Sequence, residues 1–310
     1  MKHGWLVVLA LAQGSAIAQV CAERAPAGQV DAQAFVASDS EHFDTRRAGA
    51  SYWLTPCQER NRVGIGGRLH WFEQDGWNRS GQQVLLLGQG KDTAAGSYWQ
   101  GEAGVLSQHG KNLATFDATY HGTLGPATSW EAFANRDFVE TAAALDQGIH
   151  VNFFGASLEH GLNAHLTGVA LLGHQSFSDG NERLHGRLRL IYQPFLDSGF
   201  TVQARYRWFR SEGDEGRRAY FNPDRYHESM VMAGWRKRSA DWTAVVLAGV
   251  GRQRVGEDDA TPTRLLDVSL EKRMTDAQVL SLKAGYNQSA SYGGPDYRYK
   301  QVQLQWQWRY

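Results

Sequence analysis

The stretch that most constrains the fold is residues 302–310, in which apolar and polar side chains alternate. Its even-numbered positions hold Val, Leu, Trp, Trp and Tyr, and its odd-numbered positions hold three Gln and one Arg. Alternation with a period of two predicts a β-strand with one apolar and one polar face. A soluble sandwich would bury the apolar face against a second layer. A membrane barrel would turn that face to lipid, with the aromatic rings at the interface.

The same alternating unit recurs along the whole chain, and each copy is about ten residues long and is followed by a turn. Residues 140–147 could instead form a short helix. Sixteen strands are expected near residues 29–38, 47–56, 62–72, 81–90, 96–108, 111–121, 126–136, 147–157, 162–175, 181–193, 199–211, 226–238, 241–254, 262–273, 276–288 and 297–310. Nothing resembles a linker or a second domain, so residues 19–310 are expected to be one unit.

The connections between these strands differ in length according to their position. Connections after even-numbered strands are short, such as residues 122–125, 239–240 and 274–275. The long connections follow odd-numbered strands: residues 137–146, 212–225 and 289–296. Outer-membrane barrels have short periplasmic turns and longer extracellular loops. The sequence therefore predicts an all-β fold, a single antiparallel transmembrane β-barrel of about sixteen strands in the outer membrane of a Gram-negative bacterium.

The N-terminal residues have the pattern of a secretory signal peptide. Lys2 and His3 precede an apolar run over residues 5–12, and residues 16–18 read Ala-Ile-Ala, a small-x-small cleavage site. Residues 1–18 are thus expected to be a signal peptide. The charge is balanced, with 32 Lys and Arg against 32 Asp and Glu, which argues against a nucleic-acid partner.

Cys21 and Cys57 are the two cysteines of the chain. In the predicted topology both lie on the periplasmic side, the first before the first strand and the second after the second strand. A pair of cysteines in an oxidising compartment favours a disulfide. Two free thiols are the alternative.

Arginines dominate one face of two neighbouring predicted strands. Residues 181–193 and 199–211 alternate Leu, Tyr, Phe, Val and Trp with polar side chains, and an arginine facing lipid at mid-bilayer would cost about 2–4 kcal/mol. The arginines must therefore face the lumen: Arg183, Arg187, Arg189, Arg205 and Arg207. Acidic residues also have lumen parity, namely Glu102, Asp117, Glu131, Asp267 and Glu271. These groups either act on a cargo or neutralise one another and fill the interior.

A barrel of about sixteen strands is wide enough for an aqueous channel unless loops occupy it. The predicted function is accordingly a conduit. We expect Arg187, Arg189, Arg205 and Arg207 to line it.

Two motifs resemble a known family. Residues 178–183 read Ser-Asp-Gly-Asn-Glu-Arg in a predicted hairpin, and residues 220–226 read Tyr-Phe-Asn-Pro-Asp-Arg-Tyr at the end of the longest loop. Together they are similar to the C-terminal barrel of exopolysaccharide-export porins of the poly-N-acetylglucosamine, cellulose and Pel systems, and to lone barrels of the YaiO type. The resemblance implies a pore for a secreted polysaccharide, whose extracellular mouth is shaped by Asp179, Asn181, Arg183, Asn222 and Arg225.

The same resemblance implies partners. Members of the family usually carry a periplasmic helical scaffold, which this sequence lacks, so a separate scaffold protein is a possible partner. The aromatic end of residues 302–310 is similar to the signal that barrels present to the barrel-assembly machinery. A general diffusion porin is the alternative function.

His174 and Ser176 support a third interpretation. Their spacing on one strand face resembles the His-x-Ser of outer-membrane phospholipase A, in which the histidine activates the serine. The Asn-Gly expected after the serine is replaced by Phe177-Ser178, and no calcium-ligand pattern is present. The sequence therefore favours a protein that is not an enzyme and needs no cofactor, and a hydrolase remains the alternative.

Overall fold

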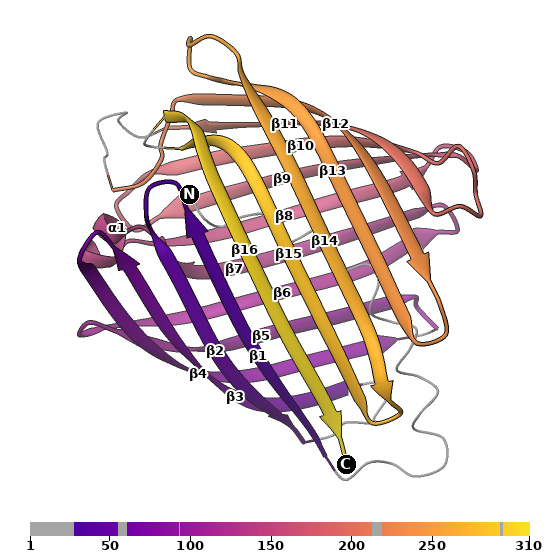
Figure 1. The fold of residues 1–310 in the computed structure, drawn as a ribbon, viewed down its shortest axis with the longest axis horizontal. Coiled ribbons are helices and arrows are strands. Elements are labelled where there is room, and N and C mark those ends of the chain that lie inside the picture. Colours follow the sequence, from indigo (N-terminus) through magenta and orange to yellow (C-terminus); the bar gives the residue numbers. More distant parts are fainter. Residues whose placement is uncertain (1–27, 55–60, 93, 213–218, 292–293) are drawn as a thin grey trace.

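The computed structural model describes residues 28–54, 61–92, 94–212, 219–291 and 294–310 (Figure 1). The predicted signal peptide and the predicted Cys21–Cys57 bond lie outside these residues. Sixteen strands and one short helix follow in order: β1 (Gln29–Asp39), β2 (Asp44–Trp53), β3 (Asn61–Gln74), β4 (Trp77–Asp92), β5 (Ser97–Gln108), β6 (Lys111–Gly125), β7 (Thr128–Phe138), α1 (Ala142–Gln147), β8 (His150–Gly161), β9 (Leu166–Phe177), β10 (Glu182–Tyr192), β11 (Phe200–Ser211), β12 (Arg225–Arg238), β13 (Trp242–Val255), β14 (Thr261–Thr275), β15 (Gln278–Ser291) and β16 (Gly294–Arg309).

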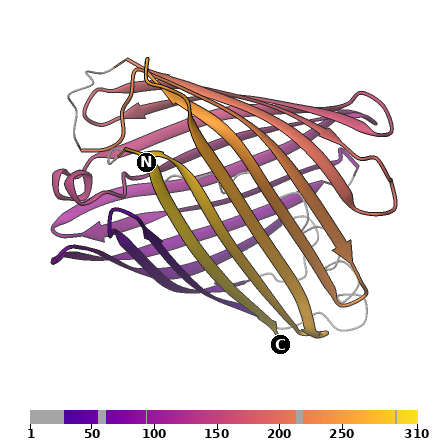
Figure 2. The same ribbon diagram turned by 45° about the horizontal axis from the view of Figure 1, so that its top comes forward.

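The strands form one closed antiparallel barrel, as predicted. Each strand pairs with its neighbour in the sequence, and β1 pairs with β16 from Gln29 opposite Arg309 to Asp39 opposite Tyr299. Figures 1 and 2 show all strands inclined in the same sense around the barrel. Closure leaves no strand edge unpaired, which is the condition for a sheet in a membrane.

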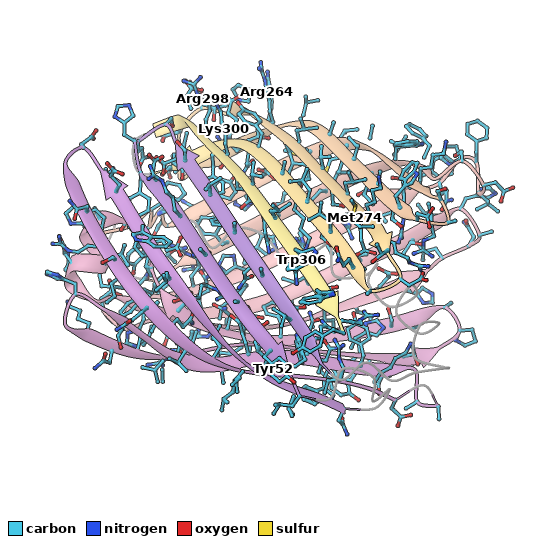
Figure 3. The ribbon with its side chains drawn as sticks, turned by 60° about the horizontal axis from the view of Figure 1, so that its bottom comes forward. Tyr52, Arg264, Met274, Arg298, Lys300 and Trp306 are labelled. Atoms are coloured by element: carbon cyan, nitrogen blue, oxygen red, sulfur yellow. The ribbon has the colours of Figure 1, made fainter. Side chains whose placement is uncertain are left out.

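The outer face is apolar, and residues 302–310 show how the alternation produces it. Val302, Leu304 and Trp308 point outward and are 42, 42 and 38 % exposed, because no second layer covers them. Trp308 and Tyr310 rings lie 5.0 Å apart, in an aromatic group at the end of β16. Figure 3 shows Trp306 and Tyr52 near this end of the outer surface. An exposed apolar band with aromatic residues at its border is the lipid-facing surface of an outer-membrane barrel.

The two ends of the barrel differ. The first residue of β1 and the last residue of β16 lie at the same end of the barrel, which we call the periplasmic end. Residues 139–149 and the described connection residues 219–224 lie at the opposite end, which we call the extracellular end because long loops face outward in such barrels. Figure 1 shows α1 at this second end. Within the described residues, no helix is long and apolar enough to span a membrane.

The predicted helix near residues 140–147 is confirmed as α1. Thr141 caps its start by accepting a hydrogen bond from the Ala144 backbone, and Gly148 ends it with φ 74°. Leu145 packs into a buried cluster with inward-facing Phe72, Leu106 and Leu113 of the barrel wall. Because these partners face the interior, α1 is folded into the mouth of the barrel.

The predicted segregation of loop lengths is only partly correct. The connections after β3 and β5 are as short as periplasmic turns, and the long loop expected at residues 289–296 is absent, because β15 continues to Ser291 and β16 begins at Gly294. Ser289 is buried on the inner face, and Tyr297 donates a hydrogen bond to Asp39 at 2.9 Å. Small polar residues that suit a turn here suit the polar interior of a barrel equally well.

Candidate functional site

The strand register assembles the predicted arginines on the inner wall. Arg187 lies opposite Arg207, and Arg189 lies opposite Arg205, across the β10–β11 pair. Leu188 and Leu190, which alternate with the arginines of β10, are about half exposed on the outer surface. The alternation therefore placed these side chains on the correct faces.

Glu228 of β12 is the partner that the sequence analysis missed. Its carboxylate accepts from Arg205 at 2.9 Å and from Arg207 at 2.7 Å, and the side chain is fully buried. Tyr226, which stands on the same inner face, accepts a hydrogen bond from Arg207 at 2.8 Å. Register pairs Arg207 with Glu228 across β11 and β12. The inward parity of Glu228 is visible in the sequence, but its position beside the arginines depends on the hairpin register.

A second charged group lies on the β3–β6 wall. Arg68 donates to both carboxylate oxygens of Glu102 at 3.0 Å, in the forked geometry that guanidinium and carboxylate favour. Asp117 accepts from Asn135 at 2.9 Å. Both Glu102 and Asp117 face the lumen, as predicted. In these two groups each charge is therefore matched by an opposite charge or an amide beside it.

Between these walls lies a cavity of about 340 Å³. Its lining combines amides, aromatic rings and charged groups: Gln33, Phe35, Phe133, Phe153, Gln301 and Gln303, together with Arg187 and Glu102. Such a surface can form hydrogen bonds to hydroxyl groups and can also contact flat apolar faces. The lining is largely polar, and the barrel wall encloses the cavity.

Four of the five predicted mouth residues come together. Asn181, fully buried, donates to the Tyr220 hydroxyl at 3.0 Å and to Asn222 at 2.9 Å. Arg183 donates to Asn222 at 3.0 Å and to the Phe221 carbonyl at 2.9 Å. The Tyr220 hydroxyl also donates to the Asp179 carboxylate, at 3.0 Å. The two motifs, whose residues Asn181 and Tyr220 are 39 positions apart, thus bind each other directly.

Tyr220 is the residue of this group that the sequence analysis did not assign. Its ring stacks on Phe177 at 4.6 Å, and burial raises the pKa of its hydroxyl to about 12. The hydroxyl is therefore protonated at physiological pH and can donate to Asp179. Val139, Ala144 and Ile149 belong to the same buried cluster as Tyr220. We call α1, the 179–183 hairpin and residues 219–222 together the cap.

Arg225 does not join the cap, contrary to the expectation. Tyr226 points inward, so Arg225 points outward, where it lies 3.7 Å from Glu257 in an exposed pair. Within the motif over residues 220–226, the loop ends and β12 begins at Arg225. From there, successive side chains of the strand point alternately out of and into the barrel.

His174 and Ser176 are on the outer surface near the extracellular end. The Ser176 hydroxyl accepts from Asn152 at 3.2 Å, and the His174 imidazole lies 3.5 Å from the Glu182 carboxylate. Across the part of the chain that the structure describes, no hydrogen bond joins His174 to Ser176. In this structure the histidine faces Glu182 rather than the serine.

No known protein family matches the sequence, and no curated protein is similar to it in sequence. Solved structures are similar in fold. A bacterial polysaccharide outer membrane secretin has a TM-score of 0.71 at 12% identity, over 92% of this chain and 99% of that chain. The Salmonella typhi OmpF in complex with daunomycin has a TM-score of 0.42 at 9% identity, over 91% of this chain and 97% of that chain. The first likeness and the lipid-facing surface define the fold as a sixteen-stranded outer-membrane β-barrel, located in the outer membrane.

Proposed function

We propose that this protein is an outer-membrane channel through which a secreted polysaccharide leaves the cell. One observation carries the proposal: a closed barrel surrounds a cavity lined by amides, carboxylates, guanidinium groups and aromatic rings. The similar fold of the bacterial polysaccharide outer membrane secretin supports a polysaccharide as the cargo.

The chemistry of the lining suits a sugar polymer. Hydroxyl groups donate and accept hydrogen bonds, and Gln33, Gln301 and Gln303 offer both functions. Phe133 and Phe153 line the same cavity, with ring centroids 5.0 Å apart, and offer apolar surface to the faces of sugar rings. A conduit must bind its cargo at many weak sites rather than at one strong site. Arginines and carboxylates that are already paired with each other provide contacts of this weak kind.

The cap favours a gated channel over a general diffusion porin. Hydrogen bonds from Asn181 and Arg183 fix residues 219–222 over the extracellular mouth, and α1 packs inside it. A porin for small solutes would need a mouth that is open at rest. A polymer export channel needs one that opens only when cargo arrives, delivered by a periplasmic scaffold protein where the family resemblance holds.

Planar-bilayer conductance of the refolded full chain tests the proposal. The unaltered barrel is expected to conduct weakly, and Tyr220→Ala/Asn222→Ala is expected to open it, because the pair removes the stacked ring and the acceptor that hold the cap. A neutral oligosaccharide added to the opened variant should block its current reversibly. Tyr192→Ala, on the outer surface of β10, is the control and should leave conductance unchanged.

Three results would contradict the proposal in different ways. A wide, steady conductance in the unaltered protein would favour the diffusion porin. A variant that folds but never conducts would indicate a filled lumen. An open variant that oligosaccharides do not block would contradict a polysaccharide as the cargo but would still support a channel.

A further inference from the structure

The outer surface carries an unusual concentration of positive charge on one side of the barrel. Five cations point outward from the extracellular halves of β13, β14 and β16, and all are exposed. They are Arg252, Arg254, Arg264, Arg298 and Lys300, which we call the outer basic surface. Figure 3 shows Arg264, Arg298 and Lys300 close together at one end of the outer surface, with Trp306 toward the other.

The register sets how these cations are spaced. Arg264 and Arg298 both lie opposite Gln288 of β15, one on each side of it. One intervening strand separates their backbones by about 10 Å. Lys300 follows Arg298 on the same face two residues later. The guanidinium groups thus border a shallow surface over β15 rather than stacking in one column.

The depth of this surface in the membrane follows from β16. From Lys300 to Tyr310 the strand rises about 33 Å, which at a tilt of about 40° is about 25 Å along the membrane normal. The outward side chains between them are Val302, Leu304, Trp306 and Trp308. The apolar band of an outer-membrane barrel is about 25 Å tall. With Tyr310 at the periplasmic interface, Lys300 lies at the outer-leaflet interface, where lipid headgroups begin.

The protein neutralises these charges only in part. Within the described ranges, none of the five takes part in an ion pair, whereas neighbouring Arg225 lies 3.7 Å from Glu257. Asp296 is the one acidic residue on the outward strand positions of this region, and it accepts a hydrogen bond from Gln288. Cations this close repel one another unless anions lie between them. Glu257, Asp258 and Asp259 follow β13 in an exposed loop, and Glu257 already lies beside Arg225. The five cations still outnumber the remaining acidic residues of this region, and an external anion would offset that surplus.

Outward arginines at the same end of other strands lie beside partners within the protein: Arg46 of β2 lies 3.6 Å from Glu73, and Arg136 of β7 donates to Asn152 at 2.8 Å. At the same end of the opposite wall, β4, β5, β6 and β8 turn neutral polar side chains outward: Ser80, Gln82, Ser107, Asn112 and Asn152. A simple need for polar residues at the interface would be met by these on every side. The five cations of the outer basic surface therefore exceed what polarity alone requires at this interface.

We propose that the outer basic surface binds the phosphorylated sugar headgroup of a glycolipid in the outer leaflet. Arginine binds phosphate in a bidentate geometry, and lysine binds it as a point charge. Arg264 and Arg298, on either side of Gln288, suit a headgroup that carries more than one phosphate. Val250 and Leu266 lie just below them on the outer face and are 66 and 43 % exposed, so acyl chains can pack there. The site is independent of the lumen and of what passes through it.

Lipid binding to the refolded full chain, measured by native mass spectrometry, tests this assignment. The probes are a diphosphorylated glycolipid of the lipid A type and the same glycolipid after enzymatic removal of its phosphates. The test variant is Arg264→Gln/Arg298→Gln/Lys300→Gln. The control variant, Lys237→Gln/Arg238→Gln/Lys272→Gln, removes the same charge from exposed residues at the periplasmic end. Altered gel mobility of unheated samples verifies that each variant is folded.

The affinity of the test variant for the phosphorylated probe is expected to fall on the order of 100-fold, because each cation near a lipid surface raises the affinity about fivefold. The control variant should bind as the unaltered protein does, and removal of the phosphates should weaken binding to the unaltered protein to a similar degree. Equal binding by the test variant and the unaltered protein would overturn the proposal. So would equal binding of the two probes, which would indicate contact with acyl chains only.

Discussion

At the scale of single residues, Glu228 determines how much of the positive charge on β11 is neutralised. It is fully buried between Arg205 and Arg207, and it converts two of the four predicted wall arginines into one three-residue charge group. Arg187 and Arg189 stand opposite Leu171 and Val169 on their other side. Two of the wall arginines are therefore held by Glu228 across the β11–β12 pair.

We expect Glu228→Gln to destabilise the barrel by about 3–5 kcal/mol, because removing one partner of a buried ion pair leaves the other charges buried and uncompensated. Denaturant unfolding in micelles, followed by tryptophan fluorescence, measures the change. The surplus positive charge should also move the ion selectivity of an opened channel toward anions.

The double variant Glu228→Gln/Arg205→Gln provides the matched control for this prediction. It removes one charge of each sign, so it should regain part of the lost stability. If Glu228→Gln unfolds at the same denaturant concentration as the unaltered protein, the charge group contributes nothing to stability.

At the scale of elements, the cap joins two connections that are distant in the sequence. The connection containing α1 and residues 219–222 meet through the hydrogen bond from Thr141 to the Ala219 carbonyl and through the cluster around Tyr220. The 179–183 hairpin supplies the donors that hold them. A movement of any one of the three elements would release the other two, which is how a cap can open as a unit.

Tyr220→Phe should loosen the cap without removing its packing. The ring can still stack on Phe177, but Asp179 loses a donor and Asn181 loses an acceptor in a buried site. A buried polar group that loses its partner costs about 1–3 kcal/mol. Opening events in planar bilayers should become at least several-fold more frequent.

The control for this change is Tyr192→Phe, which removes a hydroxyl from an exposed tyrosine on the outer face. It should leave the opening frequency unchanged. A Tyr220→Phe variant that gates like the unaltered protein would show that the hydroxyl network does not hold the cap closed.

At the scale of the whole molecule, every strand pairs on both sides, and this makes the barrel cooperative. No strand can detach without breaking two ladders of hydrogen bonds. We expect unheated protein in detergent to migrate differently from boiled protein on a gel, because a closed barrel has no edge from which unfolding can begin. Identical migration, together with complete extraction from membranes by aqueous buffer, would contradict the barrel.

The sequence predicted the barrel well because its strands obey one local rule. Alternation alone located all sixteen strands and assigned Arg187, Leu188 and their neighbours to the correct faces. It failed where a residue type suits two environments, as at Ser289, whose small polar side chain fits a turn or a wet interior.

The candidate site was less predictable, because it depends on register and closure. The motifs indicated that Asn181 and Asn222 belong together, but they did not reveal that Tyr220 joins them. Nor could spacing along the chain bring Glu228 to Arg207, since that neighbour is set by how the hairpin between β11 and β12 aligns. Local patterns define faces, and only the assembled sheet defines neighbours.

The pairing of β1 with β16 has a consequence for how the molecule is made. It joins side chains 280 positions apart, as in the hydrogen bond from Arg309 to Gln29. Closing so long a segment is entropically costly, so this seam is expected to form after the hairpins between consecutive strands. Until then two apolar strands have free edges that could pair with another chain. Aggregation is therefore the greatest risk during the interval before closure. A chaperone would have its largest effect at this stage of biogenesis.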